Sequence, residues 1–233
     1  RHYMKKEKKD KIDALLKESF TFYGYKLNKF KYGQDNRNIY VYDDTKEINQ
    51  IMYGIKGMEK IAPQVLYEIY RENPSDFFGV LKLMKEKGLK EPSVLKLIKL
   101  DYFSQFGHPH QLLAQVDIYA ELSTLYNKFK TAKKPSKSLF EQLSIPLDEV
   151  ATIADKETAK QFGISDNVAL LKLFKKYYKQ ILAQVSAKYP YQPTTILDKI
   201  KYEVELLGYT DLVDESVSPN YYIVTNIEVN QWG

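Results

Sequence analysis

Two glycines and two lysines lie close together within Asn49–Ile69, between apolar residues at helical spacing. Gly54 and Gly57 stand three residues apart in a chain that has only 10 glycines among 233 residues. Such a pair indicates a tight turn or a close approach of the backbone to another group. Backbone amides in a turn that opens a helix can bind a phosphate, and Lys56 and Lys60 would add positive charge beside it.

Two helices would hold this turn. We expect a short helix over residues 45–53, the hairpin Gly54-Ile55-Lys56-Gly57, and a second helix that ends near Glu72 before Asn73-Pro74. This is a helix-hairpin-helix arrangement, which would hold duplex DNA by its backbone without reading the base sequence. An ordinary packing corner between two helices, with glycine at the cap, is the alternative that the pattern leaves open.

A second copy of the pattern follows in residues 91–116, where a helix, a tight connection and another helix recur. Two such units would pack as a pseudo-symmetric pair and present both hairpins to one duplex. Two histidines flank Pro109 at the expected helix start, where capping or a phosphate contact is the expected role and zinc binding the alternative. The candidate DNA-binding residues of this second hairpin are Gln105, Gly107, His108 and His110.

The remaining patterns predict a mainly α protein (α+β) with little sheet. Alternating segments rich in Tyr and Val predict a β-hairpin over residues 25–42, and the final residues 219–233 are rich in β-forming residues. Residues 131–138 have the composition of a linker. Further helices are expected at residues 5–24, 76–88 (capped by Ser75), 139–143, 147–162, 167–188 and 194–207.

Charge is unevenly distributed along the chain. Residues 1–140 contain 26 Lys and Arg against 17 Asp and Glu, a net charge of +9, whereas residues 190–233 have 2 against 7. A basic region of this size favours an anionic partner, and a solvated lysine-rich surface is the alternative. The chain has no cysteine and no apolar run of about 20 residues, so we expect a cytoplasmic protein without a membrane span.

Catalytic constellations are not recognisable in the sequence. There is no phosphate-binding P-loop, no nucleophile elbow and no histidine-based triad. Asp43-Asp44 follows a predicted strand and is expected to be a turn pair rather than a metal site. We therefore expect no catalytic residue, no metal site and no cofactor within these 233 residues.

Much of the chain resembles a known family. The stretches "IKGMEKIAPQVLYEI" and "DFFGVLKLMKEKGLKEPSVLKLIKLDYFSQFG" are similar to the tandem helix-hairpin-helix region of bacterial family C replicative polymerases, the DNA polymerase III alpha subunit. One departure is Glu59, which stands where the family has its second hairpin glycine, so a divergent, phage-like member is expected. The matching residues are Ile55, Lys56, Gly57, Ala62, Val94, Leu95, Leu97, Ile98, Lys99, Phe103, Phe106 and Gly107.

The resemblance implies that the chain is the part of a DNA-directed DNA polymerase, a nucleotidyltransferase of DNA replication, that holds duplex primer–template DNA. The catalytic aspartates and their Mg²⁺ would belong to the parent enzyme, upstream of this region. A stand-alone helix-hairpin-helix DNA-binding or scaffold protein without polymerase activity is the alternative. The implied domains are the end of a fingers-like region (1–45), the tandem hairpins (46–130), a linker (131–137), a helical region (138–218) and the first strand of an OB fold (219–233).

One further segment resembles the internal sliding-clamp peptide of some family members. It lies between the hairpins and the expected OB fold, and an extended peptide of this kind would place a polar side chain and apolar side chains in separate subsites of the clamp. The alternative is a short helix that ends before Pro146. The candidate clamp-binding residues are Gln142, Leu143, Ser144, Ile145 and Leu147.

Overall fold

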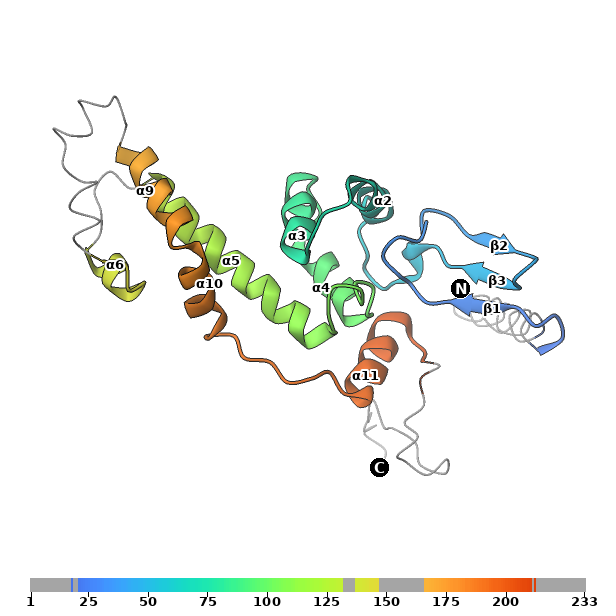
Figure 1. Ribbon diagram of the computed structural model, residues 1–233. Helices are drawn as coiled ribbons and strands as arrows, with labels where there is room; N and C mark the ends of the chain where they lie inside the picture. Colours follow the sequence, from blue (N-terminus) through green and yellow to red (C-terminus); the bar gives the residue numbers. More distant parts are fainter. Residues whose placement is uncertain (1–17, 19–20, 132–136, 147–165, 211, 213–233) are drawn as a thin grey trace, which may run out of the picture. The chain divides into compact units, whose positions relative to one another are not determined.

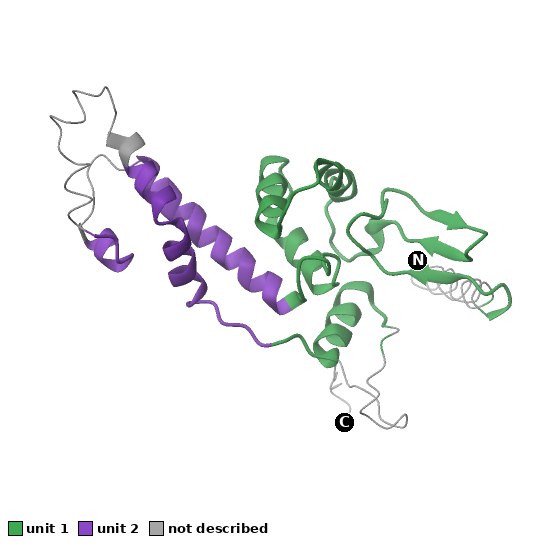
Figure 2. Ribbon diagram, viewed as in Figure 1, with its two compact units in different colours: residues 1–109, 193–233 green, residues 110–192 purple. Residues whose placement is uncertain are grey.

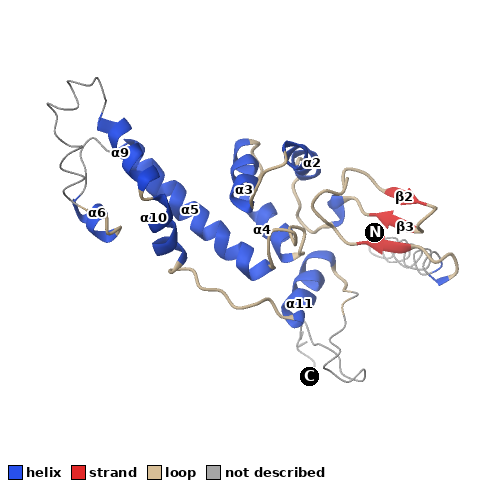
Figure 3. Cartoon of the chain, viewed as in Figure 1, coloured by secondary structure: helices blue, strands red, loops and turns tan. Residues whose placement is uncertain are grey.

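The computed structural model describes residues 18, 21–131, 137–146, 166–210 and 212 (Figure 1). The protein is mainly helical with one small β-sheet, as the sequence predicts (Figure 3). It divides into two compact units: unit 1 is residues 1–109 with 193–233, and unit 2 is residues 110–192 (Figure 2). The predictions that lie wholly or largely outside the described residues are the helix over 5–24, the linker, the helix over 147–162 and the strand over 219–233.

Unit 1 contains a three-stranded sheet with the strand order β1-β3-β2. Strands β2 (Tyr40–Tyr42) and β3 (Glu47–Asn49) are antiparallel, and β1 (Lys26–Asn28) pairs with β3 in parallel. Leu27, Ile48 and Val41 form one cross-strand row. A turn joins β2 to β3, so the domain boundary expected after residue 45 falls inside a paired hairpin.

The predicted β-hairpin over residues 25–42 is wrong, because β1 and β2 both pair with β3 and not with each other. The predicted helix over residues 45–53 is also wrong, since β3 and a short 3₁₀ helix occupy that segment. Lys46 has a φ of 56°, a left-handed conformation that no α-helix continues. Pairing on both sides of β3 satisfies its backbone groups and outweighs the local helical spacing.

Three local predictions for unit 1 can be compared with the structure: the stop at Asn73-Pro74, the helix over residues 194–207 and the cap Ser75. Asn73 ends its helix in a left-handed conformation before a proline, as expected. Thr195 and Asp198 form a capping box at the start of another helix, which Gly208 ends with a φ of 83°. The predicted cap Ser75 is wrong, because the side chain of the next residue, Asp76, accepts the Gly79 amide. The helices among the described residues of unit 1 are α2 (Ala62–Glu72), α3 (Phe77–Glu86), α4 (Glu91–Lys99) and α11 (Ile196–Leu207).

The core of unit 1 is built around a cluster of aromatic rings, which we term the aromatic cluster. Phe103 is fully buried, with its ring centroid 4.8 Å from that of Tyr102 and 5.4 Å from that of Phe77 in edge-to-face arrangements. Burial raises the pKa of Tyr32 to about 12, because a phenolate would lose its hydration there. The members are Tyr32, Tyr70, Phe77, Tyr102, Phe103 and Phe106.

The described residues of unit 2 form helices joined by turns and loops, without a strand, and in its core Phe129 packs against two other phenylalanines. The Phe129 ring centroid lies 5.4 Å from that of Phe140 and 5.3 Å from that of Phe174. The helix predicted over residues 167–188 is present as two helices separated at Tyr177. The helices are α5 (Pro109–Thr131), α6 (Lys137–Gln142), α9 (Asp166–Lys176) and α10 (Tyr178–Ser186).

Candidate functional site

The first predicted hairpin is an exposed turn between the 3₁₀ helix η1 (Met52–Gly54) and α2. Gly57 has a φ of +66°, and a Cβ on it would lie 2.9 Å from Nζ of Lys96, so glycine suits this position. Gly54 does not have a left-handed φ, and nothing lies within 4 Å of the place a Cβ would take. Only the second glycine therefore has the role that the spacing predicted.

Ile55 lies in the middle of this turn and is only 1% exposed. Its amide donates to the Met52 carbonyl, so neither its side chain nor its N–H is available to DNA. The predicted DNA contact at Ile55 is therefore contradicted. The residue instead anchors the turn in the core of unit 1.

The amide of Lys56 is also used within the protein. It donates to the carbonyl oxygen of Leu206 at 2.9 Å, near the end of α11. On the other side of the turn, the Lys96 ammonium donates to the Gly57 carbonyl at 2.6 Å. The Lys56 amide is therefore not free to bind a phosphate, and any phosphate contact here must come from side chains and the remaining amides.

Two cations of this turn stay available. The side chains of Lys56 and Lys60 are exposed, and within the described residues neither has an ion-pair partner. Neighbouring cations are engaged: Arg37, for example, donates to Asp35 at 2.7 and 2.9 Å, and these bonds lower the pKa of Asp35 to about 2. The other engaged pairs near the turn are Lys87 with Glu68 and Glu72, and Lys90 with Glu59.

Glu59 caps a neighbouring helix. Its carboxylate accepts the backbone N–H of Lys90 and the hydroxyl of Ser93, both at 2.9 Å, at the start of α4. The bond from the Lys90 amide, aided by Ser93, lowers the pKa of Glu59. The carboxylate that replaces the family's glycine is thus turned toward α4, whose own N-cap side chain makes no such bond.

Replacing Glu59 by glutamine should therefore destabilise unit 1 by about 1 kcal/mol at neutral pH, the usual worth of a charged cap. The pKa of Glu59 is lower in the folded state. The ionised Glu59 carboxylate therefore contributes its full share of the folding free energy above the unfolded-state pKa of about 4.3. This stabilisation disappears as the pH falls through the folded-state pKa. Urea unfolding of both proteins between about pH 7 and pH 3 measures this. Glu86→Gln, on the exposed side of α3, is the control, and an equal pH dependence in both variants would contradict the capping role.

The second predicted hairpin lies between α4 and α5. Gln105 is exposed, and Gly107 is partly exposed. In unit 1, Nδ1 of His108 lies 3.2 Å from the hydroxyl oxygen of Thr194. In unit 2, Nδ1 of His110 lies 3.2 Å from the carbonyl oxygen of Gln192, to which it can only donate. Both histidines thus have partners within the protein that the sequence did not indicate.

The predicted clamp-binding segment is a folded turn. Gln142 ends α6, Ser144 has a φ of 52°, and Leu143 and Ile145 are only 3% and 2% exposed. The Gln180 side chain donates to the carbonyl oxygens of Leu143 and Ser144. The segment therefore matches the alternative of a short terminating helix, and its apolar residues belong to the core of unit 2. Leu147 lies outside the described residues.

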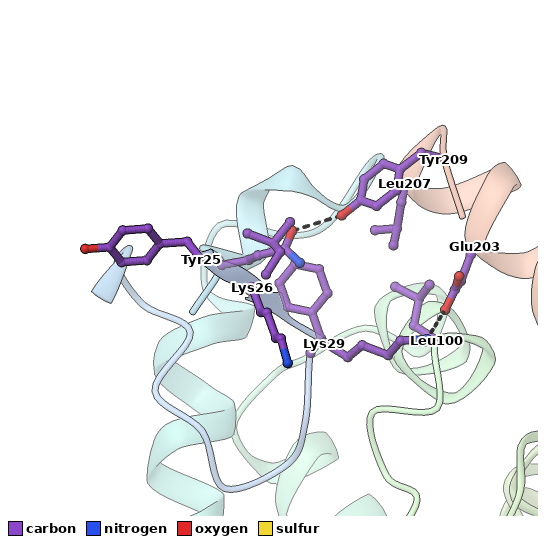
Figure 4. A pocket seen from close by; sticks show the side chains of 10 residues that line it. Tyr25, Lys26, Lys29, Leu100, Glu203, Leu207 and Tyr209 are labelled. Atoms are coloured by element: carbon purple, nitrogen blue, oxygen red, sulfur yellow. Dashed lines mark hydrogen bonds and ion pairs between the residues drawn. The ribbon is translucent and has the colours of Figure 1, made fainter. Parts of the chain in front are cut away.

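A pocket of about 510 Å³ in unit 1 had no counterpart in the sequence patterns (Figure 4). Lys29 and Glu203 form an ion pair at 3.2 Å on one wall, and the Tyr209 hydroxyl donates to Gln50 on another. No local signal could have revealed it, because its walls come from four separate segments between residues 25 and 209. The apolar lining consists of Leu27, Phe30, Leu100 and Leu207.

The described residues hold no group of three or more His, Asp or Glu side chains that could bind a metal ion. No helix in the described part of the chain is long and apolar enough to cross a membrane. Comparison with known proteins finds no family model that matches this chain, no similar curated protein and no similar solved structure.

Proposed function

We propose that the chain binds duplex DNA through its phosphate backbone, without sequence preference, as the primer–template-holding part of a replicative polymerase similar to the DNA polymerase III alpha subunit. The turn between η1 and α2 is the primary contact. Lys56 and Lys60 provide charge to neighbouring phosphates, and Gly57 lets the turn adopt its left-handed conformation. Contacts of this kind position a duplex and read none of its bases.

One observation carries the proposal: Lys56 and Lys60 stand four residues apart on an exposed turn, with no ion-pair partner among the described residues. A carboxylate beside a surface cation, such as Asp35 beside Arg37, cancels much of its attraction for a phosphate. Lys56 and Lys60 keep their full charge because no such carboxylate pairs with them among the described residues. The turn is also held firmly, since Ile55 is buried beneath it and Lys96 bonds to its carbonyl oxygen. A firmly held cationic turn loses little conformational entropy on binding.

A stand-alone DNA-binding or scaffold module is the second candidate. It is favoured by the bond from the Lys56 amide to Leu206, which fastens α11 to the hairpin within one compact unit. The parent reading frame separates the two candidates, because a polymerase would carry a palm domain with paired aspartates upstream. Duplex binding is common to both.

The double variant Lys56→Gln/Lys60→Gln tests the duplex contact. Binding of a fluorescent 20-base-pair DNA is measured by anisotropy between about 50 and 200 mM salt. The plot of log K against log salt should become shallower by about 1.8, that is about 0.9 for each of two phosphates. The control is Lys82→Gln/Lys85→Gln, which removes the same charge from the exposed side of α3. Equal losses in both variants, or no binding by the parent protein at about 50 mM salt, would refute the proposal.

A further inference from the structure

Unit 2 presents a row of four lysines that the hairpin does not include. Lys172, Lys175, Lys176 and Lys179 follow one another at intervals of three, one and three residues along α9 and the start of α10. At this spacing they lie on one helical face. All four are exposed, and we term this surface the lysine stripe.

The face is continuous across the break between the two helices. The Tyr177 amide donates to the Leu173 carbonyl, and the Ile181 amide donates to the Tyr177 carbonyl, both at 2.9 Å. These are the last bond of α9 and the first bond of α10, and the buried residues keep a helical spacing on both sides of the break, so the lysines remain on the face opposite to them. The opposite face is buried in the core of unit 2, and its residues are Leu170, Leu173, Phe174, Ile181 and Val185.

Three of the four lysines on this face have no compensating carboxylate among the described residues. Residues 167–197 contain five lysines and no Asp or Glu. Lys188 pairs with Glu121 at 2.6 Å, but among the described residues Lys172, Lys175 and Lys179 have no ion-pair partner. Like charges three and four residues apart weaken a helix, and Lys179 also stands at the positively polarised start of α10. The stripe therefore costs stability that an anionic partner would restore.

We propose that the lysine stripe is a second binding surface for the phosphate backbone of a nucleic acid, independent of the hairpin in unit 1. From Lys172 to Lys179 a helix rises about 10 Å, which matches about three base-pair steps of 3.4 Å along the axis of a duplex and so the phosphates of about three nucleotides of one strand. A bilayer fits this face less well, because a membrane-surface helix needs a free apolar side and that of α9 is already buried.

The full chain with all four lysines of the stripe changed to glutamine tests this surface, since glutamine keeps a good helix propensity. With the same 20-base-pair DNA, the salt dependence should become shallower by about 2.7, and affinity at about 100 mM salt should fall at least tenfold. Thermal unfolding should show a protein at least as stable as the parent, because the repulsion is gone. The control removes the same charge from exposed positions of unit 1, namely Lys31, Lys82, Lys85 and Lys201.

The outcomes for the two surfaces are distinguishable. Loss of binding in the stripe variant alone supports the stripe and refutes the hairpin contact, whereas loss in the Lys56→Gln/Lys60→Gln variant alone refutes the stripe. Shallower salt dependence in both variants, but not in their controls, supports both surfaces. Equal losses in the stripe variant and its control would refute the stripe. Phosphatidylserine vesicles that bind the parent protein through the stripe, with DNA binding unaffected by the variant, would also overturn the proposal.

Discussion

Replacing Phe103 by alanine should lower the free energy of unfolding by about 3–5 kcal/mol, the usual cost of removing a fully buried aromatic ring. Phe103 has no exposed surface, and its ring packs against Tyr32, Phe77 and Tyr102. The substitution leaves a cavity among rings that edge-to-face contacts hold in place, so the neighbours cannot easily close it. Urea unfolding followed by circular dichroism measures the loss.

The matched control for this prediction is Phe22→Ala, because Phe22 is 81% exposed. The same chemical change there should alter the stability by no more than about 0.5 kcal/mol. A third variant, Phe103→Leu, keeps part of the buried volume and should fall between the other two. If Phe103→Ala were no more harmful than Phe22→Ala, the aromatic cluster would not be the core of unit 1.

The helices of this protein could be predicted where their signals are local. Asn73-Pro74 stops α2, Gly208 ends α11, and Thr195 with Asp198 starts it, and each of these acts within one turn of its helix. Ser75 and Asp76 are adjacent candidates for the same cap, so the sequence could locate the start of α3 only to within one residue.

The sheet could not be predicted in this way, because strand pairing is decided between segments that are distant in the chain. Ile48 follows a helix-like spacing with Ile51 and Met52, yet it lies between Leu27 and Val41 in the sheet. The partner of a strand is chosen by packing on both sides, which no local window contains. The pocket at Lys29 and Glu203 was missed for the same reason.

The candidate site contains one feature that a local pattern predicted and two that depend on distant parts of the chain. The spacing of Gly57 and the lysines indicated a turn with exposed charge, and the structure has such a turn. The bond from the Lys56 amide to Leu206 joins residues 150 positions apart, and the bond from Glu59 to the start of α4 spans 31. Both partners became visible only in the fold, and they decide which groups of the turn remain free for a phosphate.

Ile55→Ala should have the largest effect of any single change in the hairpin, a loss of about 2–5 kcal/mol in the free energy of unfolding. Ile55 is 1% exposed, so alanine removes three buried carbon atoms from beneath the turn. If the side chain is an anchor and not a DNA contact, loss of DNA affinity should follow the loss of folded protein. Thermal unfolding and DNA anisotropy are measured on the same samples, below and above the unfolding midpoint of the variant. Together they separate loss of folded protein from loss of a direct DNA contact.

Ile61→Ala is the matched control, because Ile61 lies beside the same turn but is 47% exposed. We expect its stability to change by no more than about 0.5 kcal/mol. The substitution Ile55→Val removes a single methylene and should cost only about 0.5–1.5 kcal/mol, so that the three variants rank by buried volume. A different order would contradict the anchoring role. So would an Ile55→Ala protein that is fully folded at the assay temperature, holds its turn and still loses DNA binding, since that result would return Ile55 to the DNA interface.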